Sequence, residues 1–543
     1  MKYSSLVFAL CLSLTAYAQP GLGDEQVEVI KNFEAQLQEA EKINTTPTLP
    51  PVSDERAELQ YNLVQKSLEV EYPAPTIRPL AMRREQLPDN YKGFLKAGIG
   101  LPFGFFANGS YYTYQEAQNF DFGADVLHHS ADSDDPENQQ FMYNGAEVFG
   151  TYYTEQGLAL RGNLGYTSDR VHFFGYQPAG IDTSGVPAED VRQTFNIIDL
   201  GLKAYNSERT VADFDYNAEL DFYTMTDDFA TDEQGTRVAL SGTKWFNASY
   251  PANVRVIADF TGFEDTTQQT LNNFYVQPNF TFVRDRFRAK VGVNMVLSND
   301  EFNLFPDVSS YYSIIGNRLG AFAGVTGSLR KNTFRTLTDY NPFLISRAPG
   351  LTIANTRYLD FYGGVKGDLG SVQYSAQAGY KTTDNLPLYR LIDDADRLAQ
   401  RFRVVYDSVG IVNVQGSATA ELVQNISAVV SFTYNSYSPG REEKAWHLPS
   451  TTVNLGARYT GLEDKLLVRA DIYLENGVPF VNEKGEADNL NALFDFSVGA
   501  DYYFTEKLGG FLQVNNLAGN KRQRWRFYPT YGINILAGVS ARF

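Results

Sequence analysis

Hydrophobic and polar residues alternate in the last 13 residues of the chain, from Tyr531 to Phe543. Successive side chains of a β-strand point to opposite faces, so this period of two predicts a strand with one apolar face. A soluble sandwich could contain such a strand, but a transmembrane strand needs about 9–11 tilted residues and this stretch is long enough. We predict the closing strand of an outer-membrane barrel, with its apolar face toward lipid. The large apolar residues that would form the terminal signal for barrel assembly are Tyr531, Ile533, Ile535, Val539 and Phe543.

The same alternation recurs from Phe94 onward. Examples are Leu158–Thr167, Phe214–Phe222, Phe287–Leu297, Val412–Leu422, Ile426–Tyr434, Leu466–Leu474 and Phe494–Phe504. One face of these segments is apolar, while the other carries charge at Arg161, Asp215, Glu219, Asp221, Arg288, Lys290, Arg469, Asp471, Asp495 and Asp501. Burying unpaired charge is costly, so the charged face cannot be a dry sandwich core. We expect it to line water inside a barrel.

Short turns alternate with long polar connections. The turns are expected at Gln115–Asn119, Glu155–Gly157, Asn206–Val211, Pro251–Asn253, Arg284–Arg286, Gly316–Arg318, Gly367–Ser371, Val423–Asn425, Gly461–Lys465 and Thr505–Gly509. The long connections are expected at Ala131–Gln139, Gln177–Glu189, Lys331–Asn355, Thr382–Arg401 and Glu475–Asn491. Such alternation is typical of membrane barrels with periplasmic turns and external loops. About ten turns, with both chain ends in the periplasm, predict an all-β, antiparallel, up-and-down transmembrane β-barrel of about 22 strands over residues 92–543.

The N-terminal residues have a different pattern. Residues 1–18 contain Lys2, a short apolar run and the small-residue site Ala16-Tyr17-Ala18, which predicts a secretory signal peptide. Residues 19–91 combine an expected amphipathic helix within Gly21–Asn44 with several prolines. We expect a periplasmic or lumenal leader. It could pack in the barrel mouth, bind a partner or act as a tether.

Composition narrows the class of protein. No segment after the signal peptide has the roughly 18 uninterrupted apolar residues of a transmembrane helix. The formal net charge of −18 argues against a nucleic-acid partner, because phosphate binding needs clustered lysine and arginine. Aromatic residues make up 14% of the chain, which suits the two aromatic girdles of a barrel. The predicted location is the outer membrane of a Gram-negative bacterium, in contact with its lipid and lipopolysaccharide.

Residues for catalysis or metal binding are sparse. The single cysteine, Cys11, lies in the signal peptide, which excludes cysteine-ligated metal sites in the mature chain. Glu219 and Asp221 share a strand face and could do acid–base work, although pairing with cations opposite them in the lumen is the simpler interpretation. We predict no enzyme, no cofactor and no metal site. The histidines, which give too little for a nucleophilic hydrolase, are His128, His129, His172 and His447.

One basic cluster stands out near the C-terminus. Lys521, Arg522, Arg524 and Arg526 surround Trp525 in the last long loop. Arginine forks suit phosphate and carboxylate groups. The cluster is therefore a candidate contact for lipopolysaccharide phosphates or another anionic ligand, with a solvated loop as the alternative.

The C-terminal part resembles a known family. Phe511–Leu517, then Tyr528-Pro529 and a final strand ending in Arg542-Phe543, resemble the last hairpin of TonB-dependent receptors, and Leu448–Tyr459 resembles a strand entry of the same barrels. The resemblance implies a barrel of 22 strands and energy-coupled uptake. The family carries a folded plug of well over a hundred residues, whereas here about 70 residues precede the first expected strand. We expect a plugless relative of these receptors.

Two functions follow from this pattern. The first is a transport or uptake component with a polar-lined path. The second is a non-transporting accessory subunit of a larger outer-membrane assembly, such as secretion or barrel-insertion machinery. Expected partners are the barrel-assembly machinery during insertion and, for the second function, other outer-membrane or periplasmic proteins. Ion conductance and stable co-purification would separate the two.

Overall fold

The structure, a computed structural model, describes residues 91–113, 119–133, 135–176, 185–208, 210–247, 249–346, 351–392 and 399–543. They belong to one compact unit of the chain. The expected signal peptide and leader lie outside the described residues. No helix in the described ranges is long and apolar enough to cross a membrane.

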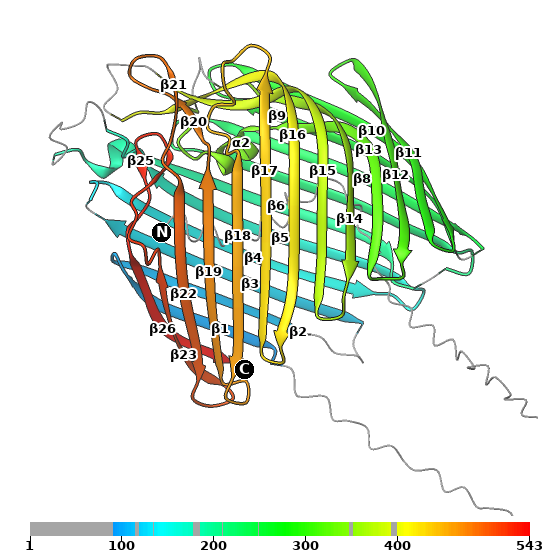
Figure 1. Ribbon diagram of the computed structural model, residues 1–543, viewed down its shortest axis with the longest axis horizontal. Helices are drawn as coiled ribbons and strands as arrows, with labels where there is room; N and C mark the ends of the chain where they lie inside the picture. The colour runs from blue at the N-terminus through cyan, green and yellow to red at the C-terminus, as the bar shows by residue number, and fades with distance from the viewer. Residues whose placement is uncertain are drawn as a thin grey trace, which may run out of the picture. The chain divides into compact units, whose positions relative to one another are not determined.

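Most of this unit is β-strand (Figure 1). The first strands are β1 (Gly93–Leu101), β2 (Gly104–Thr113), β3 (Phe120–Ser133), β4 (Gln139–Tyr153), β5 (Leu158–His172), β6 (Arg192–Asn206), β7 (Phe214–Thr226), β8 (Asp232–Phe246), β9 (Tyr250–Glu264), β10 (Gln268–Arg284), β11 (Phe287–Ser298), β12 (Glu301–Ile315) and β13 (Leu319–Asn332). The others are β14 (Ala354–Asp368), β15 (Val372–Leu391), β16 (Phe402–Val423), β17 (Ile426–Pro439), β18 (Thr451–Gly461), β19 (Leu466–Asn476), β20 (Pro479–Val481), β21 (Ala487–Asn489), β22 (Leu493–Tyr503), β23 (Leu508–Asn515), β24 (Gln523–Trp525), β25 (Tyr528–Pro529) and β26 (Asn534–Arg542). The helices are the 3₁₀ helix η1 (Ala188–Val191) and α2 (Phe334–Tyr340).

Twenty-two of the strands form one antiparallel sheet that closes on itself. Consecutive strands pair from β1 to β19, and the ring continues through β22, β23 and β26. β26 then pairs with β1, from Phe94 opposite Arg542 to Leu101 opposite Ile535. The predicted fold class and strand number are therefore confirmed. Closure leaves neither β1 nor β26 as an edge strand, which removes the usual site of unwanted strand pairing.

Two predicted connections are wrong. Pro251–Asn253 lies inside β9, and the turn instead falls between Phe246 and Tyr250. Pro251 is the second residue of that strand, where a missing N–H is tolerated. The long connection predicted from Thr382 is also too early, because β15 continues to Leu391. Its polar upper part is paired with β16 above a bulge between Thr383 and Leu386. Polar composition suggested a loop, but pairing with a neighbouring strand decided the structure.

The alternation predicted for the closing strand is confirmed for β26. Ile535 and Val539 are exposed on its outer face, whereas Leu536 and Ser540, each one residue further on, are buried. The strand is shorter than predicted, however, because it begins at Asn534. Tyr531 lies before it and is buried against Ala131 and Phe141 instead of facing outward; these three residues form a small core.

The loops at the end of the barrel opposite the C-terminus fold together. α2, β20, β21 and β25 lie at this end in Figure 1. Side chains of α2 and β25 join others from loops and strand ends in a buried apolar cluster, which we call the cap core; its largest members are Phe173, Phe174, Phe195, Phe263, Phe334, Phe343, Phe402, Trp525 and Tyr528. These residues come from loops and strand ends far apart in the sequence. Burial of this much aromatic surface stabilises one packed arrangement of the loops.

Candidate functional site

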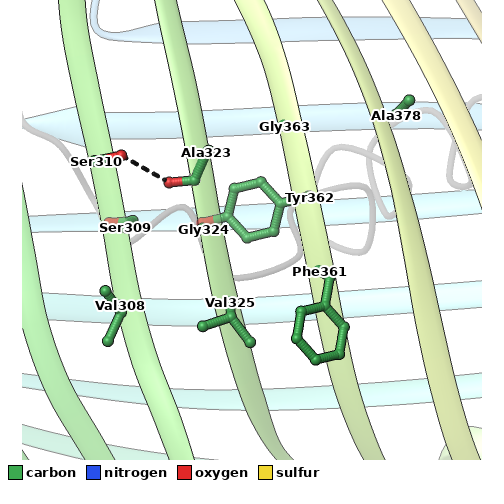
Figure 2. Close-up of a pocket in the computed structure, with 10 residues that line it drawn as sticks. All are labelled: Val308, Ser309, Ser310, Ala323, Gly324, Val325, Phe361, Tyr362, Gly363 and Ala378. Atoms are coloured by element: carbon green, nitrogen blue, oxygen red, sulfur yellow. Dashed lines mark hydrogen bonds between the residues drawn. The ribbon is translucent and has the colours of Figure 1, made fainter.

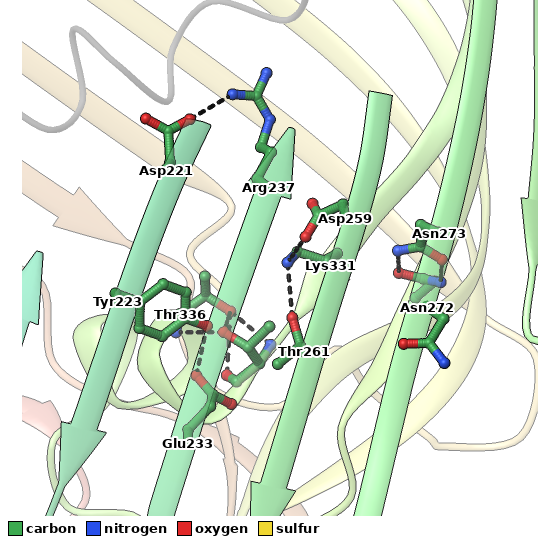
Figure 3. Close-up of polar contacts among 12 residues, drawn as sticks. Asp221, Tyr223, Glu233, Arg237, Asp259, Thr261, Asn272, Asn273, Lys331 and Thr336 are labelled. Carbon is green, nitrogen blue, oxygen red and sulfur yellow. Dashed lines mark hydrogen bonds and ion pairs between the residues drawn. The ribbon is translucent and has the colours of Figure 1, made fainter. Parts of the chain in front are cut away.

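A row of ion pairs crosses the inner face of β6 to β9. Lys203 lies opposite Glu219 in the strand register, and Asp221 lies opposite Arg237. The carboxylate of Glu219 has three cationic neighbours, Lys203 Nζ and Arg255 Nη2 at 3.4 Å and Arg237 Nη1 at 3.6 Å. Asp221 accepts a hydrogen bond of 2.9 Å from Arg237 Nη1 (Figure 3). Glu219 and Asp221 thus pair with cations opposite them.

Other inward-facing charges are paired in the same way. Lys290 Nζ lies 2.9 Å from Asp307 on the next strand. Asp501 accepts from Lys96 Nζ and from Arg469 Nη2, both at 2.6 Å, which ties β22 to β1 and β19. The polar face predicted from the alternation therefore carries opposite charges that pair with one another across the inner wall.

The upper part of the β13–β14 hairpin contacts the inner face of β9 and β10. Lys331 Nζ contacts Asp259 at 2.5 Å and Thr261 at 2.8 Å, both on the inner face of β9 (Figure 3). The amide of Asn355 donates to Asn273 Oδ1 at 2.7 Å. The upper part of this hairpin thus lies on the inner side of the neighbouring strands.

α2 is fixed at the tip of that hairpin by Glu233 of β8. The carboxylate of Glu233 accepts from the backbone N–H groups of Phe334 at 2.6 Å and Arg335 at 3.0 Å. Carboxylates are favourable at a helix N-terminus, where N–H groups lack partners. Tyr223 also donates to Glu233 at 2.9 Å, and Arg335 forms a two-pronged pair with Asp199 at 2.6 and 3.1 Å. Strands of the barrel wall therefore hold in place the loops that contain the cap core, which together we call the cap.

A buried ion pair lies beside the cap core. Arg524 Nε is 2.9 Å from Glu475 Oε1, and both side chains are almost fully buried. Arg524 also donates to Tyr340 Oη at 2.9 Å and to the carbonyl of His447 at 3.3 Å. Burial, the largest single influence, lowers the pKa of Arg524, but the carboxylate of Glu475 together with Tyr340 and Tyr473 raises the pKa of the guanidinium above its usual value. This pair joins the last external loop to the end of β19.

His447 packs beside Arg524, against the cap core. Its ring stacks on Trp525 and meets Phe402 edge-on. Nδ1 lies 2.7 Å from the carbonyl of Tyr389, so the neutral ring donates there. Burial lowers the pKa of His447 to about 3, and the charges of Arg524 and Arg526 lower it as well, against the effect of the Tyr389 hydrogen bond. His447 is therefore uncharged at neutral pH.

The predicted basic cluster does not form one exposed surface. Lys521 pairs with Asp135 at 2.7 Å. Arg524 is buried as described, and the guanidinium of Arg526 lies over the ring of Phe480. Glu475, the partner of Arg524, could not be identified from sequence, because only the fold brings the last long loop close to the end of β19. Arg522 is half-buried in the same loop.

The histidines predicted not to bind metal are separated from one another. His128 contacts Asn144 and Ser130, whereas His129 packs against Phe106 and Phe141. Neighbouring residues of a strand face opposite ways, which keeps the two rings apart. In the ranges that the structure describes, no three His, Cys, Asp or Glu residues are grouped as metal ligands.

The barrel wall carries a shallow depression of about 520 Å³ (Figure 2). A row of small residues crosses it in register, with Ser310 opposite Ala323, Ala323 opposite Gly363 and Gly363 opposite Ala378. The depression exists because these residues lack large side chains. Its rim is formed by Val308, Val325 and Phe361.

Comparisons with solved structures agree with this geometry. The chain is similar to the FrpB iron transporter from Neisseria meningitidis, with a TM-score of 0.65, 10% identity and coverage of 84% of this chain and 83% of that one. It is also similar to the pyoverdine outer membrane receptor FpvA from Pseudomonas aeruginosa, with a TM-score of 0.61, 12% identity and coverage of 84% and 79%. For the copper transporter OprC the TM-score is 0.59 at 12% identity, with 84% of each chain covered.

At the level of sequence, no protein-family model and no curated protein matches the chain. The structural similarity extends over most of the barrel at identities that establish the fold. It confirms the resemblance to TonB-dependent receptors in architecture. The chain is an outer-membrane β-barrel with the fold of the TonB-dependent receptors.

Proposed function

We propose that this barrel is an uptake component of the outer membrane, with a polar lumen whose external mouth is closed by the cap. The observation that carries the proposal is the contrast between the charged inner wall and the buried apolar cap core above it. Proteins of the same fold are described as an iron transporter, a pyoverdine receptor and a copper transporter. Their similarity supports transport as the class of function.

A barrel of 22 strands is wide enough to pass water unless something fills it. The cap supplies such a barrier at one end, because its aromatic residues are buried against one another and Arg524 is tied to Glu475. Passage of a solute then requires the external loops to separate. The ion pair between Arg524 and Glu475 is the contact whose loss would release the last external loop.

Ion conductance of the full chain in planar lipid bilayers tests the proposal. We expect low conductance for the native protein and frequent large openings for Arg524→Met, which removes one member of the buried pair. Lys521→Met is the matched control, because Lys521 forms an exposed pair in the same loop. If hydrogen exchange shows that the cap core of Arg524→Met is loosened, yet this variant conducts no more than the native chain, the barrel does not transport.

The alternative is an accessory subunit of a larger outer-membrane assembly. One observation favours it, namely an unpaired strand edge in the barrel wall, described below. Gentle detergent extraction followed by mass spectrometry distinguishes the two functions. Stoichiometric partners together with absent conductance in the Arg524→Met variant would favour the subunit.

A further inference from the structure

β12 and β13 pair over only part of their length. Their pairing begins at the turn and stops where Asp307 lies opposite Thr326. β12 nevertheless extends from Glu301, and β13 extends to Asn332. Both strands are fully described, and within the described part of the chain residues 301–306 have no strand partner on the β13 side. Continuation of the same register would have placed Phe302 opposite Lys331.

β13 leaves its neighbour because it bends into the lumen. Beyond Thr326 it still pairs with β14, up to Asn332 opposite Ala354. Asn294 of β11 donates to the carbonyl of Gly327 at 2.7 Å, and Leu329 packs against the buried cluster of Tyr275, Val296 and Phe305. The upper β13–β14 hairpin therefore packs against the inner face of the strands before it, and the β12 edge is left behind.

Two residues at the separation point account for it. Pro306 lies next to Asp307, the last residue of β12 that pairs with β13, and has no N–H to donate to a neighbouring strand. Gly327 stands at the matching position of β13, where a Cβ atom would lie 2.8 Å from both Phe305 Cδ1 and the carbonyl oxygen of Tyr358. Only glycine permits so close a passage. The separation is thus built into the sequence at both strands.

The free edge is apolar on its outer side. Phe302 is 64% exposed and Leu304 is 62% exposed. Phe274 and Leu297 occupy the same register row as Phe302 but have strands on both sides, and they are 43% and 41% exposed. Val291, which has strands on both sides, reaches 59%, so these values show that the outer side of the edge is apolar and accessible. Unpaired backbone groups beside apolar side chains cannot be satisfied by lipid.

We propose that the edge of β12 from Glu301 to Pro306 is a docking surface for an extended segment of a second, different polypeptide, which adds to it as a strand. The backbone groups of the edge supply hydrogen bonds, as in other cases of strand addition. The added segment would carry apolar residues at alternate positions beside Phe302 and Leu304. Glu301 lies 3.7 Å from Arg357 Nη1 of β14, whereas Asp300 at the hairpin tip is exposed, and its carboxylate favours a basic residue at one end of the added segment. This chain is itself strongly acidic, which disfavours a second copy as the partner.

Photo-cross-linking in intact outer membranes tests the docking surface. Benzoylphenylalanine replaces Phe302 or Leu304 in the full chain, and replaces Phe274 as the matched control on a fully paired strand. We expect both edge positions to cross-link to one peptide of one other protein, at sites two residues apart, and Phe274 to give no such product. Products with lipid alone, with a second copy, with Leu329 or Lys331 of the same chain, or with unrelated peptides would overturn the proposal.

Hydrogen exchange supplies an independent measurement that needs no substitution. In native membranes the amides of residues 302–305 should exchange at least tenfold more slowly than in the purified chain in detergent. The amides of residues 290–295 in β11, which have strands on both sides, should exchange at the same rate in both samples. Equal exchange of the β12 edge in the two preparations would contradict a docked strand.

Discussion

Glu219 and Glu475 are both carboxylates on the inner side of barrel strands, yet their surroundings differ. Glu219 has three cations within 3.6 Å, and their side chains are 32–43% exposed. Glu475 has one cationic partner among the described residues, Arg524, and accepts a hydrogen bond of 2.7 Å from Tyr473 Oη; the side chains of Glu475 and Arg524 are both buried. Solvated pairs contribute little, about 0–1 kcal/mol each, because water screens them. A buried pair is costly to break, since the remaining charge has no solvent. The lumen is therefore tolerant of substitution and the cap is not.

The largest effect is expected for Arg524→Met. It leaves the carboxylate of Glu475 buried without its partner, which should lower the free energy of cap opening by about 3–5 kcal/mol. Single-channel open probability would measure the change. In the double variant Arg524→Met/Glu475→Leu the buried charge is absent, so most of the loss should be recovered. Equal opening in the single and double variants would contradict a role for the unpaired charge.

Removal of a ring from the cap core should have an effect of similar or smaller size. Phe402→Ala deletes a fully buried side chain and should cost about 3–5 kcal/mol in cap stability. Phe361→Ala on the exposed outer wall is the control and should change hydrogen exchange in the cap very little. Comparable loosening by both variants would show that the cap core does not behave as a separate packed unit.

The cap should weaken as the pH falls. The pKa of His447 is about 3 in the folded cap and near 6.5 when the loop is solvated, so the open state binds more protons between these values. Its contribution to cap stability is complete above pH 6.5 and declines by up to about 1.4 kcal/mol per pH unit below it. Hydrogen exchange of the cap from pH 7 to pH 4, corrected for intrinsic rates, would measure this. His447→Gln should abolish most of the dependence; an unchanged pH profile would assign it to other groups.

The smallest effect is expected for Glu219→Gln in the lumen. Its three cationic neighbours remain partly solvated, so stability should fall by about 1 kcal/mol or less. In a chain opened by Arg524→Met, ion selectivity should shift toward anions, because one negative charge leaves the lumen wall. Reversal potentials in a salt gradient would record the shift. A loss of stability as large as that of Arg524→Met would erase the distinction between lumen and cap.

Sequence alone could predict the barrel because its constraint is local. The period of two fixes which residues of a strand such as β26 share a face, and the spacing of turns fixes the number of strands. The pairing of Asp221 and Glu219 with cations was also within reach, since their positions on one strand face are set by the alternation. Errors arose where pairing overrode composition, as in the polar upper part of β15.

The cap and the β12 edge depend on contacts between distant parts of the chain. Nothing in the local pattern around Arg524 identifies Glu475 as its partner, because 49 residues and several strands separate them. Nothing around Tyr531 reveals that it is buried against Ala131 and Phe141. Likewise Pro306 and Gly327 each suggest an irregularity, but only their juxtaposition leaves a strand without a neighbour. Alternation and turn spacing thus determined the barrel, its strand number and its charged inner face. The packed cap core and the unpaired part of β12 were decided by the tertiary structure, which sets long-range contacts that no local period encodes.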